Sequence, residues 1–143
     1  MRVVLDTNVY ISFLLTRGVT ISHILDAWEK NTFTLLISPQ VLAEIRRVMA
    51  YPHLKARIKP HEAEALLEAL ENDAVMLEGK LALTGITPDP KDNMVIACGE
   101  EGKADYIVSG DPHLLKIKQY ADVQIVSPAE FVRVLSESGS DTG

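Results

Sequence analysis

The stretch RVVLDTN at residues 2–8 decides the fold of this chain, because an apolar segment there runs directly into a carboxylate. Val3, Val4 and Leu5 form a continuous apolar run without alternation, which is typical of a strand covered on both faces at the centre of a parallel sheet. In such sheets, functional groups gather beyond the carboxyl ends of the strands. Asp6 is therefore expected at that edge of the sheet.

The rest of the chain alternates segments of strand and helix character. The further strands are expected at residues 33–37, 75–77, 105–109 and 123–126, with helices between them. This alternation predicts an α/β fold, a three-layer α/β/α sandwich around a mostly parallel sheet of about five strands. Residues 1–135 are expected to form one domain, and the polar segment 136–143 is expected to be a disordered tail.

Composition limits the kinds of partner. The chain has 143 residues, of which 14 are Lys or Arg and 20 are Asp or Glu, so its formal charge is −6. A protein with this charge is no general polyanion binder, and any contact with nucleic acid must be local. Cys98 is the single cysteine, which excludes an internal disulfide. With no secretory signal and no apolar run of membrane-spanning length, we expect a cytoplasmic protein without a membrane partner.

Four acidic residues are expected to approach one edge of the sheet. In right-handed strand–helix–strand units, a helix begins at the edge where the preceding strand ends. Asp6 and Asp111 end strands, Asp92 begins a helix, and Glu44 lies one turn into the helix after the second strand. Clustered carboxylates repel one another unless cations lie between them. Oxygen ligands favour Mg²⁺ or Mn²⁺, so a site for one or two such ions is predicted.

Each of these residues also has an ordinary explanation. Asp6, Asp92 and Asp111 suit helix starts, as caps or as first-turn acids, and Glu44 could be a solvated residue paired with Arg47 three positions later. Taken singly, these structural roles are the commoner ones. The convergence of several acids at one edge is what favours a site.

Four stretches carry a resemblance to the PIN-domain family and its small VapC-like toxin members. They are VVLDTNVYIS at 3–12, LLISPQVLAEIRRVM at 35–49, DPKDNMVIACGEEGKADYIVSGDPHLL at 89–115 and IVSPAEFVRVL at 125–135. The resemblance implies a metal-dependent ribonuclease of a toxin–antitoxin pair. Its implied acidic site residues are Asp6, Glu44, Asp92 and Asp111. The chain departs from the family in having His113 where many relatives carry a further acid and Ser109 where threonine is common.

The chemistry of RNA hydrolysis suggests a role for each residue. Asp6 and Asp111 are expected to be the main metal ligands, Asp92 a direct or water-mediated ligand, and Glu44 a residue that orients water. The side chains expected to hold these carboxylates in place are Thr7, Asn8 and Ser109. The basic residues assigned to substrate are Arg17, Arg46 and Arg47.

The expected partners are single-stranded RNA, a cognate antitoxin that covers the acidic site, and a second copy of the chain in a homodimer. The main alternative is a metal-binding or protein-interaction module of the same fold without turnover. A phosphoacceptor signalling domain is disfavoured because no lysine stands at another strand end. An Asp-nucleophile phosphatase is disfavoured because Asn8, and not a second acid, lies two residues after Asp6.

Overall fold

The strand predicted at the start of the chain is β1, Arg2–Leu5, and in this computed structural model it lies inside a six-stranded sheet. The structure describes residues 1–142, with side chains described as far as Glu137. The other strands are β2 Thr34–Ile37, β3 Val75–Met76, β4 Tyr106–Val108, β5 Gln119–Tyr120 and β6 Val123–Val126. The helices are α1 Thr7–Thr16, α2 Val19–Glu29, α3 Pro39–Met49, α4 Pro52–Lys55, α5 Pro60–Asp73, α6 Pro90–Glu101, α7 Pro112–Leu115 and α8 Pro128–Thr142.

The sheet has the strand order β3-β2-β1-β4-β6-β5, and β1 is one of its two middle strands. Val4 pairs with Leu36 on one side and with Ile107 on the other, both in parallel register. Val3, Val4 and Leu5 are fully buried, as their continuous apolar run predicts. The chain leaves β1 towards β2 and later returns to β4 on the opposite side. The carboxyl ends of β1 and β4 therefore border a topological switch point.

The sixth strand, β5, was not expected from the sequence. Gln119 and Tyr120 pair antiparallel with Gln124 and Val123 of β6, and they form one edge of the sheet. Ala121, with φ of 52°, helps to turn the chain between the two strands. A two-residue strand has too few positions to show alternation or an apolar run, which is why the pattern of residues did not reveal it.

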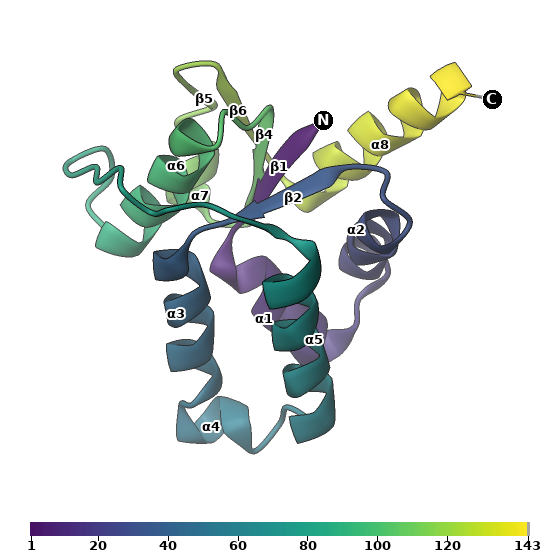
Figure 1. Cartoon of the computed structure of the whole chain (residues 1–143), viewed down its shortest axis with the longest axis vertical. Helices are drawn as coiled ribbons and strands as arrows, with labels where there is room; N and C mark the ends of the chain where they lie inside the picture. Colours follow the sequence, from purple (N-terminus) through teal and green to yellow (C-terminus); the bar gives the residue numbers. More distant parts are fainter. Residues whose placement is uncertain (143) are drawn as a thin grey trace.

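Helices cover both sides of the sheet, so the predicted three-layer α/β/α arrangement is confirmed (Figure 1). Helix α6 packs against β1, β2 and β4. On the other side, α8 packs against α2, and Phe131 meets Phe33 edge to face with ring centroids 5.4 Å apart. A Cβ at Gly99 would lie 2.8 Å from Ile107 Cδ1, so glycine lets α6 approach β4 closely.

Helices α3, α4 and α5 form an arm that extends from the sheet (Figure 1). Ser38 caps α3 by accepting a hydrogen bond from the Val41 N–H at 3.2 Å, and Pro39 follows at the first helical position. The helix ends at Met49, and Pro52 begins the short α4, so the interruption expected at Pro52 is present.

Helix α8 is longer than the sequence suggested. It was expected to end near Leu135 and to be followed by a disordered tail over 136–143, but the helix continues to Thr142, and Gly143 lies outside the described residues. Residues 136–142 include no proline and only one glycine. One glycine costs a helix only about 1 kcal/mol. Among the described residues, no helix is long and apolar enough to cross a membrane.

Candidate active site

Two neighbouring strand ends bring Asp6 and Asp111 to the same edge. The Asp6 N–H donates to the Val108 carbonyl at 2.9 Å, which fixes the end of β1 beside the end of β4. The Ser109 hydroxyl donates to Asp6 Oδ2 at 2.7 Å and accepts from the Asp111 N–H at 3.0 Å. Ser109 is fully buried. One hydroxyl therefore connects the segments that carry the two acids.

Asp92 reaches this edge from the start of α6. Asp89 caps the helix by accepting from the Lys91 N–H at 2.9 Å, which places Asp92 in the first turn. The turn is held by Asn93, whose Oδ1 accepts from the Thr87 N–H at 2.9 Å and whose Nδ2 donates to the Thr87 carbonyl at 3.3 Å. Both side chains are buried. This Thr87–Asn93 pair was not singled out from the sequence, since its only signal was the position of Asn93 beside Asp92.

Burial and mutual repulsion raise the pKa of the acids at this edge. Burial, followed by the charge of Asp111 and a hydrogen bond with it, raises the pKa of Asp92 to about 7; Asp6 adds a smaller repulsion. Burial also raises the pKa of Asp6, against the opposing hydrogen bond from Ser109. Asp92 is 4% exposed, and its Oδ2 atom is buried without a hydrogen-bond partner among the described residues. The structure therefore brings Asp6, Asp92 and Asp111 together.

The capping roles considered from the sequence are only partly present. Asp111 Oδ1 accepts from the His113 N–H at 2.8 Å and so caps α7, leaving its second oxygen outside that bond. Asp6 occupies the cap position of α1, but its side chain makes no capping hydrogen bond there. Thr7 is buried and Asn8 is exposed, and within the described structure neither side chain hydrogen-bonds to Asp6.

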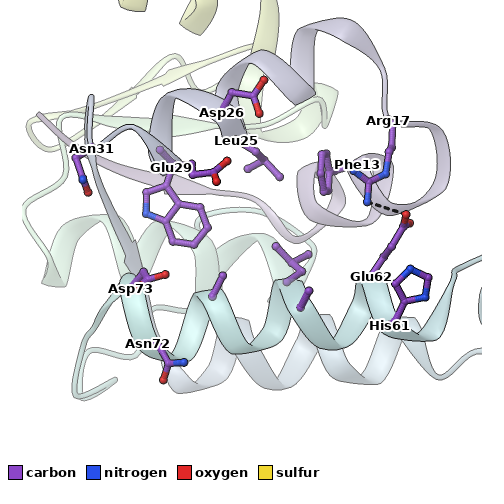
Figure 2. A pocket seen from close by; sticks show the side chains of 14 residues that line it. Phe13, Arg17, Leu25, Asp26, Glu29, Asn31, His61, Glu62, Asn72 and Asp73 are labelled. Carbon is purple, nitrogen blue, oxygen red and sulfur yellow. Dashed lines mark ion pairs between the residues drawn. The ribbon is translucent and has the colours of Figure 1, made fainter.

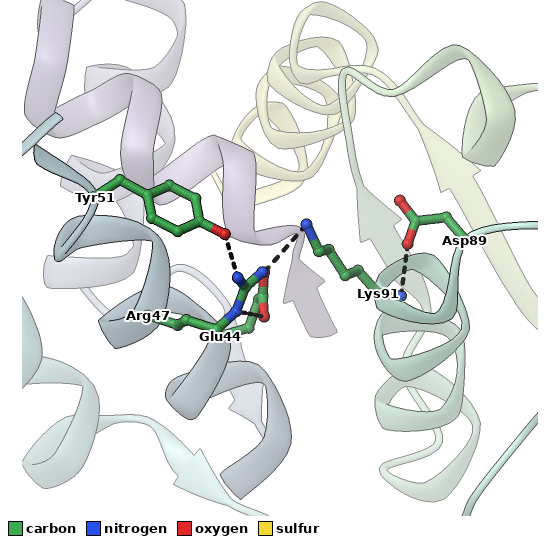
Figure 3. A network of polar contacts seen from close by, with 5 residues as sticks. All are labelled: Glu44, Arg47, Tyr51, Asp89 and Lys91. Atoms are coloured by element: carbon green, nitrogen blue, oxygen red, sulfur yellow. Dashed lines mark hydrogen bonds and ion pairs between the residues drawn. The ribbon is translucent and has the colours of Figure 1, made fainter. Parts of the chain in front are cut away.

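Glu44 lies in a different environment, between α3 and α6 (Figure 3). Its two carboxylate oxygens accept from Arg47 at 2.9 and 2.6 Å, which is the pairing that the spacing of the two residues suggested. Lys91 Nζ approaches Glu44 Oε1 at 3.8 Å from the other helix, and Arg47 also donates to the Tyr51 hydroxyl. Glu44 is only 8% exposed, yet two cations face it.

The donor chemistry of the edge suits a hard divalent cation. Three carboxylates converge, and one of them has a buried oxygen without a partner, which is the kind of site that Mg²⁺ or Mn²⁺ binds. In the described part of the chain, no group of three or more His, Cys, Asp or Glu side chains lies close enough together to hold a metal ion. The residues fit the ion by chemistry, and coordination requires their side chains to turn towards one another.

A wide cavity lies away from the acidic edge. A hollow of about 780 Å³ lies between α1, α2 and α5, and none of the four predicted acids lines it (Figure 2). Arg17 lines this cavity, where its guanidinium pairs with Glu62 at 3.0 Å. Arg46 pairs with Glu71 of α5. Of the three arginines assigned to substrate, only Arg47 contacts one of the predicted acids.

Comparisons with known proteins bear on the family and the fold of the chain. The model of the PIN domain matches residues 2–113, a range that contains all four predicted acids. The fold is similar to that in the crystal structure of VapBC2 from Rickettsia felis bound to a DNA fragment from their promoter, with a TM-score of 0.60 and 14% identity. That likeness covers 89% of this chain and 98% of the other. A comparison with curated proteins found no match. The chain belongs to the PIN-domain family.

Proposed function

We propose that the protein is a divalent-metal-dependent endoribonuclease that hydrolyses single-stranded RNA, and that it is the toxin of a toxin–antitoxin pair. Membership of the PIN-domain family supports a nuclease. The observation that carries the proposal is the gathering of three carboxylates at one sheet edge, where Asp6 and Asp92 are buried and an Asp92 oxygen has no partner among the described groups. Such an arrangement is costly in a folded protein, and a bound cation would offset the cost.

Asp6, Asp92 and Asp111 would hold one or two Mg²⁺ or Mn²⁺ ions. When bound, the cation would neutralise the phosphate and lower the pKa of a water molecule so that hydroxide forms near neutral pH. Ser109 orients the Asp6 carboxylate through its 2.7 Å hydrogen bond. The Thr87–Asn93 pair fixes the helical turn that carries Asp92. These supporting contacts hold the carboxylates at the edge before substrate arrives.

Glu44 would border the reacting groups from α3 and orient water, as expected from the sequence. Its bidentate contact with Arg47 suggests a role in substrate binding for the cations around Glu44. Arg47 and Lys91 both face the Glu44 carboxylate, so both stand where an RNA phosphate would compete for them. Thr7 and Asn8 remain candidates for supporting the Asp6 carboxylate.

The partner would be an antitoxin that covers the acidic edge, and the protein would act in the cytoplasm as a homodimer. The similar structure contains VapBC2 with promoter DNA, which supports looking for a partner protein of this kind. Co-expression with the product of the neighbouring gene, followed by co-purification, tests the pairing. Growth arrest on expression of the chain alone, relieved by that product, is the expected result.

Cleavage of single-stranded RNA tests the enzymatic proposal. Wild-type protein should cut the RNA with Mn²⁺ or Mg²⁺, stop on addition of chelator, and leave 5′-phosphate and 3′-hydroxyl ends. The Asp6→Asn variant is the matched control, because it keeps the shape of the side chain and removes its charge. Equal cleavage by both proteins would point to a contaminating nuclease, and a 2′,3′-cyclic phosphate product would contradict hydrolysis by an activated water.

A module without turnover is the second candidate, and the environment of Glu44 favours it. Two cations already compensate this acid, so Glu44 does not need a metal ion to be stable. The two candidates differ in the cleavage assay. Metal binding by calorimetry without cleavage of any RNA would select the module.

A further inference from the structure

Two aromatic rings and a guanidinium, here called the column, lie together at the corner between α3 and α4. The rings of Tyr51 and His53 are nearly parallel, with an interplanar angle of 17° and centroids 6.0 Å apart. The Arg47 guanidinium lies 5.3 Å from the centroid of the Tyr51 ring and donates to its hydroxyl. Tyr51 is half-buried and His53 is exposed, so the column ends in solvent at His53.

The column is not part of the packing of the protein. Neither Tyr51 nor His53 belongs to the hydrophobic core or to the apolar side chains packed against it. The break at Pro52 sets Tyr51 immediately before α4 and His53 within it. An exposed stack of aromatic rings that contributes nothing to the core is free to receive a flat ligand.

A set of contacts leads from the column to the first turn of α6, which carries Asp92. Arg47 holds both oxygens of Glu44, and Lys91 approaches the same carboxylate at 3.8 Å (Figure 3). Lys91 directly precedes Asp92 in α6. A chain of RNA crossing from the acidic edge to the column would therefore pass two cations on its way.

We propose that Tyr51 and His53 form a stacking platform for a base of single-stranded RNA, with Arg47 and Lys91 contacting the adjoining phosphates. This inference rests on the proposed function and adds a substrate contact to it. Every base has a flat face, so aromatic side chains hold single strands with little dependence on sequence. Arginine is suited to contact both the Tyr51 ring and an RNA phosphate, since its guanidinium stacks on aromatic rings and binds phosphate through two N–H groups.

Cationic residues that are close to the column in the sequence also favour a polyanion. Lys55, Arg57 and Lys59 follow the column in sequence, and all three are exposed. None of them is in an ion pair with any described side chain. A protein of net charge −6 requires such a local concentration of cations to hold a polyanion.

Binding of RNA without cleavage tests the platform. The full chain carrying Asp6→Asn is titrated into a fluorescein-labelled single-stranded RNA of about 10 nucleotides, with chelator present, and anisotropy gives Kd. Adding His53→Leu should weaken binding about 5- to 150-fold, the range expected for the loss of one stacked base. His53→Phe keeps a flat ring without a charge and should bind within about threefold of the parent.

The controls separate stacking from charge and from loss of fold. His61→Leu removes another exposed histidine, on α5, and should leave Kd unchanged. The slope of log K against log salt should stay the same for His53→Leu and fall by about 0.7 for Lys91→Gln, the contribution of one phosphate contact on a single strand. Tyr51→Leu should weaken binding at least as much as His53→Leu.

The outcomes for the platform and for the nuclease are distinguishable. If His53→Leu and Tyr51→Leu bind RNA as tightly as His61→Leu while the wild type still cleaves RNA, the platform is wrong and the nuclease stands. If the binding losses appear but the wild type cleaves no RNA with Mn²⁺, the platform stands and the nuclease is wrong. If the Asp6→Asn protein binds no RNA at all while the wild type still cleaves it with Mn²⁺, the platform is wrong and the nuclease stands.

Discussion

Asp6 and Asp92 at the acidic edge are buried about as deeply as Glu44 on α3, but the charges around them differ. Asp6 and Asp92 are 5% and 4% exposed and have other acids as neighbours, whereas Glu44 is 8% exposed and has Arg47 and Lys91. In the first region, burial and repulsion raise the pKa of the carboxyls. In the second, the protein supplies the positive charge itself. Only the first region is therefore expected to gain stability from an external cation.

The largest expected contrast is in catalysis. Asp111→Asn should lower the rate of Mn²⁺-dependent RNA cleavage by more than about 100-fold, since even residues that support metal ligands are worth 10–100-fold. Asparagine can still cap α7, so folding should be preserved. Glu44→Gln should lower the rate of cleavage only about 10-fold, the lower end of that range. Rates from single-turnover cleavage decide the order, and a larger loss for Glu44→Gln would move the centre of the site to α3.

Ser109 offers a test of how the acidic edge is held together. Ser109→Ala removes the hydroxyl that contacts Asp6 and the Asp111 N–H, so the affinity for Mn²⁺ measured by calorimetry should fall about 10- to 100-fold. Ser22→Ala, in α2, is the matched control and should bind Mn²⁺ as the wild type does. An unchanged affinity for Ser109→Ala would show that the two aspartates keep their positions without the bridging hydroxyl.

The pH dependence of stability should report the cost of ionising Asp92, which is buried beside other acids. Its pKa is about 7 in the folded protein against the ordinary value of 3.8 for an aspartate, so between these values the folded state binds more protons than the unfolded state. Stability from this group is therefore highest below pH 4 and is lost as pH rises through 7. Asp92→Asn should be more stable than the wild type by about 1–2 kcal/mol at pH 8, after allowance for solvent screening.

Urea unfolding at pH 5 and pH 8 measures this difference. The advantage of Asp92→Asn should grow from the lower to the higher pH. In the wild type, saturating Mn²⁺ at pH 8 should recover the lost stability, by about 2.7 kcal/mol at 100 times Kd. If Asp92→Asn is less stable than the wild type at pH 8, the ionised Asp92 carboxylate does not destabilise the folded protein.

The smallest effect, and one of opposite sign, is expected at Glu44. Glu44→Gln removes the anion that Arg47 and Lys91 share, so the free energy of unfolding should fall by about 0.5–1 kcal/mol. The effect is small because the side chain of Arg47 is 46% exposed. Thermal unfolding at low salt measures it. If Glu44→Gln instead raises the free energy of unfolding, the Glu44 carboxylate destabilises the protein as the aspartates of the acidic edge do, and the two regions do not differ.

Much of the architecture could be predicted from local patterns. The buried run in β1, the Ser38-Pro39 start of α3 and the break at Pro52 each depend on a few adjacent residues. The contact between Glu44 and Arg47 follows from helical spacing of three residues. What these features share is short range, so the sequence carries them without knowledge of the fold.

Other contacts depend on residues far apart in the chain. Lys91 faces Glu44 only because α6 packs beside α3, and β5 exists only because β6 offers it an edge. Local patterns contain no signal for such contacts, since each is decided by the packing of elements that the sequence describes separately.

The sequence alone determined the family of folds and the three acids that follow strand ends or begin a helix, because strand and helix periodicity together with right-handed connections limit where those residues lie. The tertiary structure decided how each acid is compensated. Asp92 has Asp111 and Asp6 beside it, whereas Glu44 has Arg47 and Lys91. Charge compensation is a property of neighbours in space, and residues 44 and 91 become neighbours only when the chain has folded.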